Sequence, residues 1–255
     1  MKITRAVVPS LFTVLNMFCG FLSIVQSSEG HFDFAAWFIL LGGVFDSLDG
    51  MMARITKSTS EFGVEFDSLS DVVSFGAAPA FMVYKLNLFH LEGFGVLISS
   101  LLLLMGGIRL ARFNVQLVGF DKEYFNGLPI PASAITIVAF VLSFRNETVG
   151  LTGYPEMILP YLVTALALLM VSKVKYDPLP KPHMKEVKKH PWRVITFCAF
   201  ALILIFTKGQ ALFYLCLAYI LIGLVRYLWK FASKLTGSLN EKSSEETEEV
   251  TSYDV

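Results

Sequence analysis

Several long apolar runs set the strongest limit on what this chain can fold into. A helix needs about 20 predominantly apolar residues to cross the hydrocarbon core of a bilayer, and several runs here reach that length. Of the 255 residues, 55% are hydrophobic and only 16% are charged, whereas a soluble domain of this size carries more charge and fewer such runs. The sequence therefore predicts an all-α, polytopic membrane protein.

The hydropathy pattern predicts about eight transmembrane helices and divides the chain into four parts. The expected helices cover residues 9–27, 33–55, 64–86, 93–112, 131–146, 155–172, 193–207 and 210–230. The expected parts are a six-helix core (1–172), a basic cytoplasmic loop (173–192), a C-terminal transmembrane hairpin (193–235) and a disordered acidic tail (236–255). Pro79 lies inside the third expected helix and should kink it, because proline cannot donate a backbone hydrogen bond.

The distribution of basic residues predicts the orientation of these helices. With the N-terminus inside, 18 of the 21 Lys and Arg residues fall on the cytoplasmic side and 3 on the other, namely Lys85, Arg145 and Lys208. Because cytoplasmic loops of membrane proteins carry an excess of Lys and Arg, we expect an even number of spans and both termini in the cytoplasm. The second and third expected helices then have their aspartate-bearing ends on the cytoplasmic side.

Four aspartates lie at these two helix ends, in the stretch DSLDGMMARITKSTSEFGVEFDSLSD. Asp46 and Asp49 are three residues apart, and Asp67 and Asp71 are four apart, so each pair shares one helix face. Uncompensated carboxylates near a membrane would repel one another, and a hard divalent cation such as Mg²⁺, Mn²⁺ or Ca²⁺ would remove that repulsion. The alternative is a structural role, in which the aspartates pair with Arg54 and its neighbours to fasten two helices.

Small and basic residues beside the aspartates favour a phosphate-bearing ligand. Gly50, Ala53 and Gly63 remove bulk next to the carboxylates, so that a ligand can approach the backbone closely. Arg54 and Lys57 add positive charge at the same place. Metal ions, a gap and cations together suit a ligand that carries phosphates.

The same stretch resembles the signature of the CDP-alcohol phosphotransferase family, DxxDGxxAR, eight residues, then GxxxDxxxD. Residues 46–54 and 63–71 match all eight fixed positions and the spacing. The resemblance implies a six-helix membrane core, often in a homodimer, with a polar cavity that opens to the cytoplasm. It also implies a reaction in which a CDP-activated substrate passes its phosphoryl-linked group to an alcohol and releases CMP.

The resemblance further implies a role for each residue of the motif. Asp67 and Asp71 would be catalytic, and Asp71 would be the base that deprotonates the acceptor hydroxyl. The implied ligands of two divalent ions, Mg²⁺ or Mn²⁺, are Asp46, Asp49, Asp67 and Asp71. The implied nucleotide-binding residues of the motif are Asp46, Gly50, Ala53, Arg54 and Gly63.

Two stretches outside the motif indicate the acceptor. The stretch PSLFTVLNMFCG, with Thr13 and Asn16, resembles the first helix of phosphatidylserine synthases, where polar residues border the nucleotide site. RLARFN followed by FNGLPIPA resembles the bacterial and archaeal membrane-bound members of that group. Serine as the acceptor would need a cation for its carboxylate. The candidates for binding serine or the lipid phosphate are Arg109, Arg112, Asn114 and Lys57, although both arginines also fit ordinary anchoring at the cytoplasmic face.

The resulting expectation is an enzyme of the cytoplasmic membrane, with its active site in the cytoplasm. It would use CDP-diacylglycerol, or a CDP-archaeol-type lipid, and L-serine, and would form phosphatidylserine and CMP. Its partners would be membrane lipids and a second copy of the chain, and not nucleic acid. The alternatives are a transferase of the same family with another acceptor, such as inositol phosphate or glycerol phosphate, a cation transporter, or a structural membrane protein.

Overall fold

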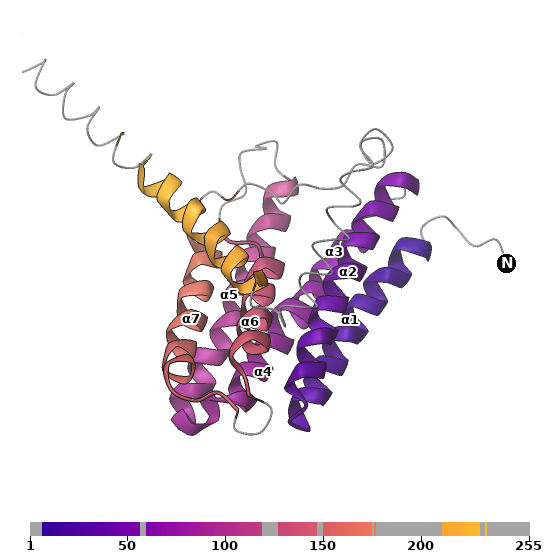
Figure 1. Ribbon diagram of the computed structural model, residues 1–255. Coiled ribbons are helices and arrows are strands. Elements are labelled where there is room, and N and C mark those ends of the chain that lie inside the picture. Colours follow the sequence, from indigo (N-terminus) through magenta and orange to yellow (C-terminus); the bar gives the residue numbers. More distant parts are fainter. Residues whose placement is uncertain are drawn as a thin grey trace, which may run out of the picture.

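A computed structural model describes residues 7–56, 60–118, 127–146, 150–174, 176, 211–229 and 233. These residues form a bundle of helices, and the only β-type pairing among them is an isolated bridge between Asn146 and Gly150. The elements, in order, are α1 (Val7–Ser28), α2 (Phe32–Thr56), α3 (Glu61–Asp71), the π-helical turn η1 (Val72–Ala77), α4 (Ala78–Leu86), the 3₁₀ turn η2 (Leu88–Leu91), α5 (Glu92–Val118), α6 (Ile130–Phe144), α7 (Tyr154–Val171) and a last helix, Ala211–Trp229 (Figure 1).

The expected all-helical, polytopic membrane fold is confirmed. Within the described part of the chain, five helices are long and apolar enough to cross a membrane. They comprise Leu11–Ser28, Phe32–Ala53, Leu88–Val115, Tyr154–Val171 and Ala211–Trp229, and Ile130–Phe144 is a shorter apolar helix. The expected span 193–207 and the expected tail 236–255 lie outside the described residues, as does nearly all of the expected loop 173–192.

The third expected span is built from α3, η1 and α4, which follow one another without a break. The expected distortion at Pro79 takes the form of the π-helical turn just before it, and Pro79 itself lies in the first turn of α4. Because proline has no N–H to donate to the preceding turn, the helix is distorted just before it, and a π-helical turn is one of the recognised forms of such a distortion. The widened turn begins directly after Asp71, so that it falls beside the acidic residues.

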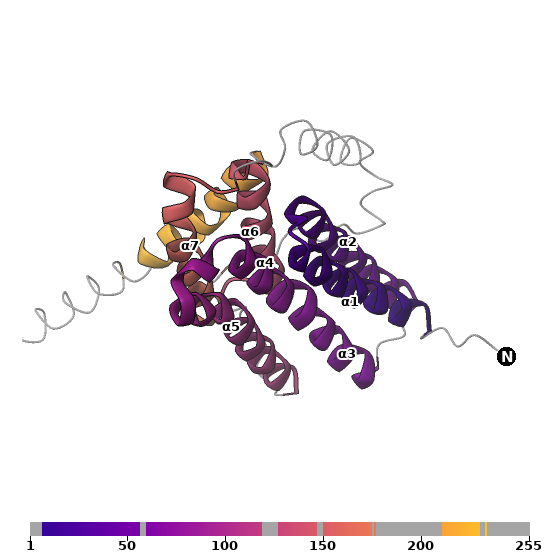
Figure 2. The ribbon, with the colours of Figure 1, turned by 90° about the horizontal axis from the view of Figure 1, so that it is seen from below.

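The helices form two groups with α3 and α4 between them. α1 and α2 lie side by side and are joined by a tight turn in which Gly30 has a positive φ of 83°. Seen from below, α3 and α4 run between this pair and α5, and α6, α7 and the last helix lie on the other side (Figure 2). The turn that follows α3, η1, contacts α1 on one side and α5 and α6 on the other.

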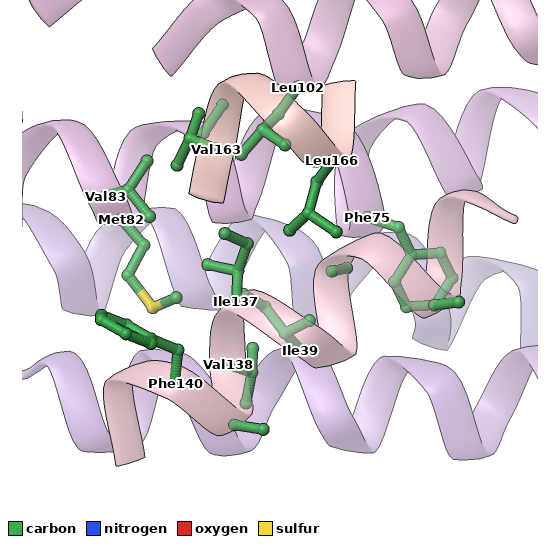
Figure 3. Close-up of a cluster of buried hydrophobic side chains, with 14 of the residues drawn as sticks. Ile39, Phe75, Met82, Val83, Leu102, Ile137, Val138, Phe140, Val163 and Leu166 are labelled. Atoms are coloured by element: carbon green, nitrogen blue, oxygen red, sulfur yellow. The ribbon is translucent and has the colours of Figure 1, made fainter. Parts of the chain in front are cut away.

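Helix α6 passes through the centre of the bundle. Most of its residues are buried, and Ile137 packs in the core among side chains of the surrounding elements, including Ile39 of α2, Phe75 of η1 and Leu166 of α7 (Figure 3). The outer faces of the other helices expose large apolar side chains, among them Phe18, Trp37 and many more. Such a surface suits lipid as the surrounding solvent, because exposed apolar patches of this extent are rare on soluble monomers.

Candidate active site

Three of the four aspartates converge between α2 and α3. Asp46 comes from α2, and Asp67 and Asp71 come from successive turns of α3. One carboxylate oxygen of each lies within 4.8 Å of the other two. Two oxygens on opposite sides of a Mg²⁺ ion lie about 4.2 Å apart, so this spacing fits a divalent cation after a small contraction.

Asp49 lies next to this group. Its side chain is buried and accepts a hydrogen bond from the hydroxyl of Thr13 of α1. It also interacts electrostatically with Asp67, so it belongs to the same acidic site. All four aspartates of the motif are thus brought together, three within ligand distance of one another and the fourth held by a neutral donor.

Helix α1 supplies a second neutral donor, to Asp71. The amide nitrogen of Asn16 donates to Asp71 Oδ1 over 3.3 Å, and Asn16 is fully buried. The sequence predicted Thr13 and Asn16 as neighbours of a nucleotide, whereas their donor groups in this structure face carboxylates. A neutral donor orients a carboxylate without cancelling the negative charge that a metal ion needs.

The close contact between α1 and the α3–η1 segment depends on a small residue and two serines. A Cβ on Gly20 would lie 2.7 Å from Ser74 Cα, so only glycine allows this approach. Ser74 Oγ donates to the carbonyl of Asn16 over 2.8 Å, and Ser70 Oγ donates to the carbonyl of Thr13 over 3.0 Å. These contacts fix the position of α1 along α3. They thereby place the donors Thr13 and Asn16 opposite the carboxylates of Asp49 and Asp71.

The three small residues of the motif have different surroundings. Gly50 is exposed, and a Cβ there would meet nothing within 4 Å, so that the space beside it is open. Ala53 lies one turn further on α2 and is half-buried. Gly63 lies in the first turn of α3, where its N–H donates to Ser60, the N-cap residue, over 3.0 Å. The side chain of Arg54 and all of Lys57 lie outside the described residues.

The basic residues of α5 are placed differently from one another. Arg109 is half-buried and interacts electrostatically with Asp71. Arg112, one turn later, is exposed, and its Nη1 donates to the carbonyl of Val171 at the end of α7 over 3.1 Å. Asn114 donates to Ser68 Oγ over 3.0 Å and so connects α5 to α3. Of the two arginines, it is Arg109 that faces the acidic site.

The donor set fits a divalent metal. The ligands available are carboxylate oxygens, which suit Mg²⁺ or Mn²⁺ and do not suit a thiolate-seeking ion. The positive charge that Arg109 places beside Asp71 does not balance the several carboxylates gathered here. Sequence reasoning missed Ser70 and Ser74, and the weak signal for them is their four-residue spacing, which places both on one helix face towards α1.

Comparison with known proteins gives consistent matches. The family model described as CDP-alcohol phosphatidyltransferase matches residues 6–171. A CDP-diacylglycerol–serine O-phosphatidyltransferase of Helicobacter pylori is 36% identical over 221 residues, which cover 87% of this chain and 91% of the relative. The archaetidylserine synthase of Methanothermobacter thermautotrophicus is 41% identical over 179 residues, 69% of this chain and 72% of the relative. A Bacillus subtilis CDP-diacylglycerol–serine O-phosphatidyltransferase is 31% identical over 185 residues, 72% and 98% of the two chains.

Proposed function

The chain belongs to the CDP-alcohol phosphatidyltransferase family, and on that premise we propose that it transfers the phosphatidyl group of CDP-diacylglycerol to the hydroxyl of L-serine. The observation that carries the proposal is the convergence of Asp46, Asp67 and Asp71 on one point. The names of the relatives, from bacteria and an archaeon, support serine as the acceptor. The products are phosphatidylserine and CMP.

Asp46, Asp49, Asp67 and Asp71 are the residues that would hold divalent metal, as Mg²⁺ or Mn²⁺. When bound, such ions neutralise the charge that builds on the diphosphate as the bond to phosphorus breaks. Asp71 takes the proton of the serine hydroxyl, while the amide of Asn16 keeps the Asp71 carboxylate in one orientation. A bond then forms between the serine oxygen and the phosphorus nearest the diacylglycerol, the bond from that phosphorus to the CMP oxygen breaks, and CMP leaves.

The open space beside Gly50 is the proposed place of the cytidine nucleotide. The backbone of α2 is accessible there, and Ala53 extends the same face. Arg54, Gly63, Thr13 and Asn16 complete the proposed nucleotide side of the site. Thr13 and Asn16 act through Asp49 and Asp71, to which their hydrogen bonds run.

Arg109 is the proposed ligand of the serine carboxylate. A guanidinium can bind a carboxylate with two parallel hydrogen bonds, and Arg109 interacts electrostatically with Asp71 of the acidic site. Arg112 and Asn114 contact α7 and α3, so they support the walls of this region, and Lys57 is a proposed contact of the lipid phosphate.

The membrane placement completes the proposal. The acidic site and both termini face the cytoplasm, where serine is available, and the acyl chains of the lipid enter laterally between helices. Residues 1–172 form the catalytic core, 173–192 a basic loop, 193–235 a hairpin and 236–255 a tail. The enzyme acts as a homodimer, as the family resemblance implies.

The proposal is tested by an acceptor screen that follows CMP. Purified protein receives CDP-diacylglycerol and Mg²⁺ or Mn²⁺, together with serine, glycerol phosphate or inositol phosphate. Release of CMP with serine alone is the expected result. Release only with one of the phosphorylated acceptors would keep the family and reject serine. A parallel assay with a CDP-activated archaeol lipid tests whether the tails matter, because one relative is named an archaetidylserine synthase.

A further inference from the structure

Helix α3, which carries Asp67 and Asp71, is tied to a neighbouring helix on each flank. Towards α1, the hydroxyl of Ser70 donates to the carbonyl of Thr13 over 3.0 Å. Towards α5, Ser68 Oγ accepts a hydrogen bond from Asn114 Nδ2 over 3.0 Å. Figure 2 shows α3 between these two neighbours. The contact with α1 has been described above as part of the acidic site, and the contact with α5 is its counterpart on the other flank.

The two ties lie on either side of the carboxylates. An α-helix turns by about 100° per residue, so Ser70 projects about 60° to one side of Asp67 and Ser68 about 100° to the other. Asp71, four residues after Asp67, projects about 40° towards the Ser68 side. Both carboxylates therefore point between the two ties. A rotation of α3 about its own axis would move them relative to Asp46, and ties on opposite flanks oppose such a rotation.

Apolar packing does not hold the α5 flank of α3 at this end. Leu69 of α3 and Val115 of α5, each next to a tie residue in sequence, are 61% and 74% exposed. Among the described residues, α3 packs closely along α1 and only slightly against α5, whereas α5 packs against η1 and α4. The hydrogen bond from Asn114 thus joins α3 and α5 where their apolar side chains do not.

Asn114 is itself held in one orientation. Its Nδ2 donates to Ser68 Oγ and, over 3.3 Å, to Glu65 Oε2. Ser68 Oγ donates to the carbonyl of Val64 over 3.1 Å, and a hydroxyl can donate one bond and accept another at the same time. An amide nitrogen carries two protons, and the bonds to Ser68 and Glu65 use both. In this arrangement Asn114 has no amide proton left for a substrate.

We infer that Asn114 is a positioning residue for the acidic site, and that it acts through Ser68 by fixing the rotation of α3. The sequence predicted Asn114 as a contact of serine or of the lipid phosphate, whereas this inference gives it an indirect role. The inference rests on the proposed function, in which Asp67 and Asp71 hold divalent metal and Asp71 is the base. Loss of the tie should weaken metal binding and slow the chemistry, and it should leave the affinity for serine nearly unchanged.

The test measures two quantities, Mn²⁺ binding by electron paramagnetic resonance without substrates and kcat for CMP release with serine. Asn114→Ala and Ser68→Ala should each weaken Mn²⁺ binding and lower kcat by about 3- to 10-fold, which is the effect of one lost hydrogen bond. The double variant should be no worse than either single variant, because both substitutions remove the same tie. The KM for serine should change by less than about 2-fold in all three.

Two further variants separate this role from a general loss of stability. Asn87→Ala removes an amide that donates to the carbonyl of Glu156 over 3.2 Å, and so also joins two distant segments, at the other end of the bundle. It should keep Mn²⁺ binding and kcat within about 2-fold of wild type. Ser68→Thr keeps the hydroxyl and with it the tie, so it should retain both properties, unlike Ser68→Ala.

The outcomes separate the possible failures. If Asn114→Ala binds Mn²⁺ as tightly as Asn87→Ala and has the same kcat, the inference is wrong and the proposed function stands. If Asn114→Ala raises the KM for serine and adds to the effect of Ser68→Ala, Asn114 contacts the acceptor directly, which also overturns the inference. If the wild type binds Mn²⁺ but releases no CMP with serine, the proposed function fails, and the Mn²⁺ binding of the variants alone decides the inference. If the wild type binds no Mn²⁺, both fail.

Discussion

The acidic and basic halves of the proposed site are held in different ways. The acidic half is joined by hydrogen bonds between neighbouring helices, from Thr13 and Asn16 of α1 to Asp49 and Asp71. The basic half depends on a single arginine of α5, Arg109, which interacts electrostatically with Asp71. The acidic half is thus braced by hydrogen bonds between helices, whereas the basic half rests on one side chain. Mutations should therefore damage chemistry in the first half and substrate selection in the second.

The largest effect is expected from the acidic half, in Asp71→Asn. The variant loses the base and one metal ligand, so CMP release should fall by more than about 1,000-fold. Binding of CDP-diacylglycerol should persist in part, because Asp46, Asp49 and Asp67 can still hold one ion. Asp33→Asn is the control, since Asp33 pairs with Arg145 at the other end of α2 and should keep most of its activity. Turnover within a few-fold of wild type in Asp71→Asn would remove Asp71 as the base.

Asn16→Ala should have the next largest effect. The Asp71 carboxylate loses its neutral donor, and kcat should fall by about 10- to 100-fold, the range found when outer hydrogen bonds to metal ligands are removed. The required concentration of Mg²⁺ or Mn²⁺ should rise at the same time. Ser23→Ala is a control on the same helix, because the Ser23 hydroxyl is buried without a hydrogen-bond partner among the described residues. An unchanged metal requirement in Asn16→Ala would count against this role.

Gly50→Leu probes the open space beside α2. Because a Cβ at this position would meet nothing within 4 Å, the helix should stay folded while the nucleotide loses its place. The KM for CDP-diacylglycerol should rise by about 10-fold or more, and thermal stability should stay within about 1 kcal/mol of wild type. Gly107→Leu is the control, since Gly107 of α5 is equally open. Unaltered affinity for CDP-diacylglycerol would show that the gap is not the nucleotide site.

The smallest effect in this series is expected from Arg112→Gln, compared with Arg109→Gln. Arg109→Gln should raise the KM for serine by about 10-fold, because a charged hydrogen bond to the carboxylate is lost. Arg112→Gln removes a contact to the carbonyl of Val171 and should change that KM by less than about 3-fold. A larger effect at Arg112 would reverse the assignment of the two arginines.

The sequence predicted the acidic half far better than the basic half. Asp46, Asp49, Asp67 and Asp71 lie on two consecutive helices, and helical spacing alone places each pair on one face. The helices that carry them were predicted because a run of about 20 apolar residues has few possible structures other than a transmembrane helix. Both signals are local, and local signals survive in a sequence without any knowledge of how the helices pack.

The features that the sequence did not predict depend on contacts between distant segments. No feature of the sequence indicates the π-helical turn after Asp71, apart from the proline that follows it, Pro79. Asn16 lies 55 residues from its acceptor, so its partner could not be identified. Arg109 and Arg112 share one helix face in the sequence, and only the packing of α5 against α3 and α7 separates their surroundings.

The central claim is that the converging aspartates bind divalent metal, and the most direct test is Mn²⁺ binding followed by electron paramagnetic resonance on purified protein in detergent. The wild type and Asp33→Asn should bind Mn²⁺, whereas Asp67→Asn should bind it much more weakly or with fewer ions. Equal Mn²⁺ binding by the wild type and Asp67→Asn, or no binding by either, would contradict the account.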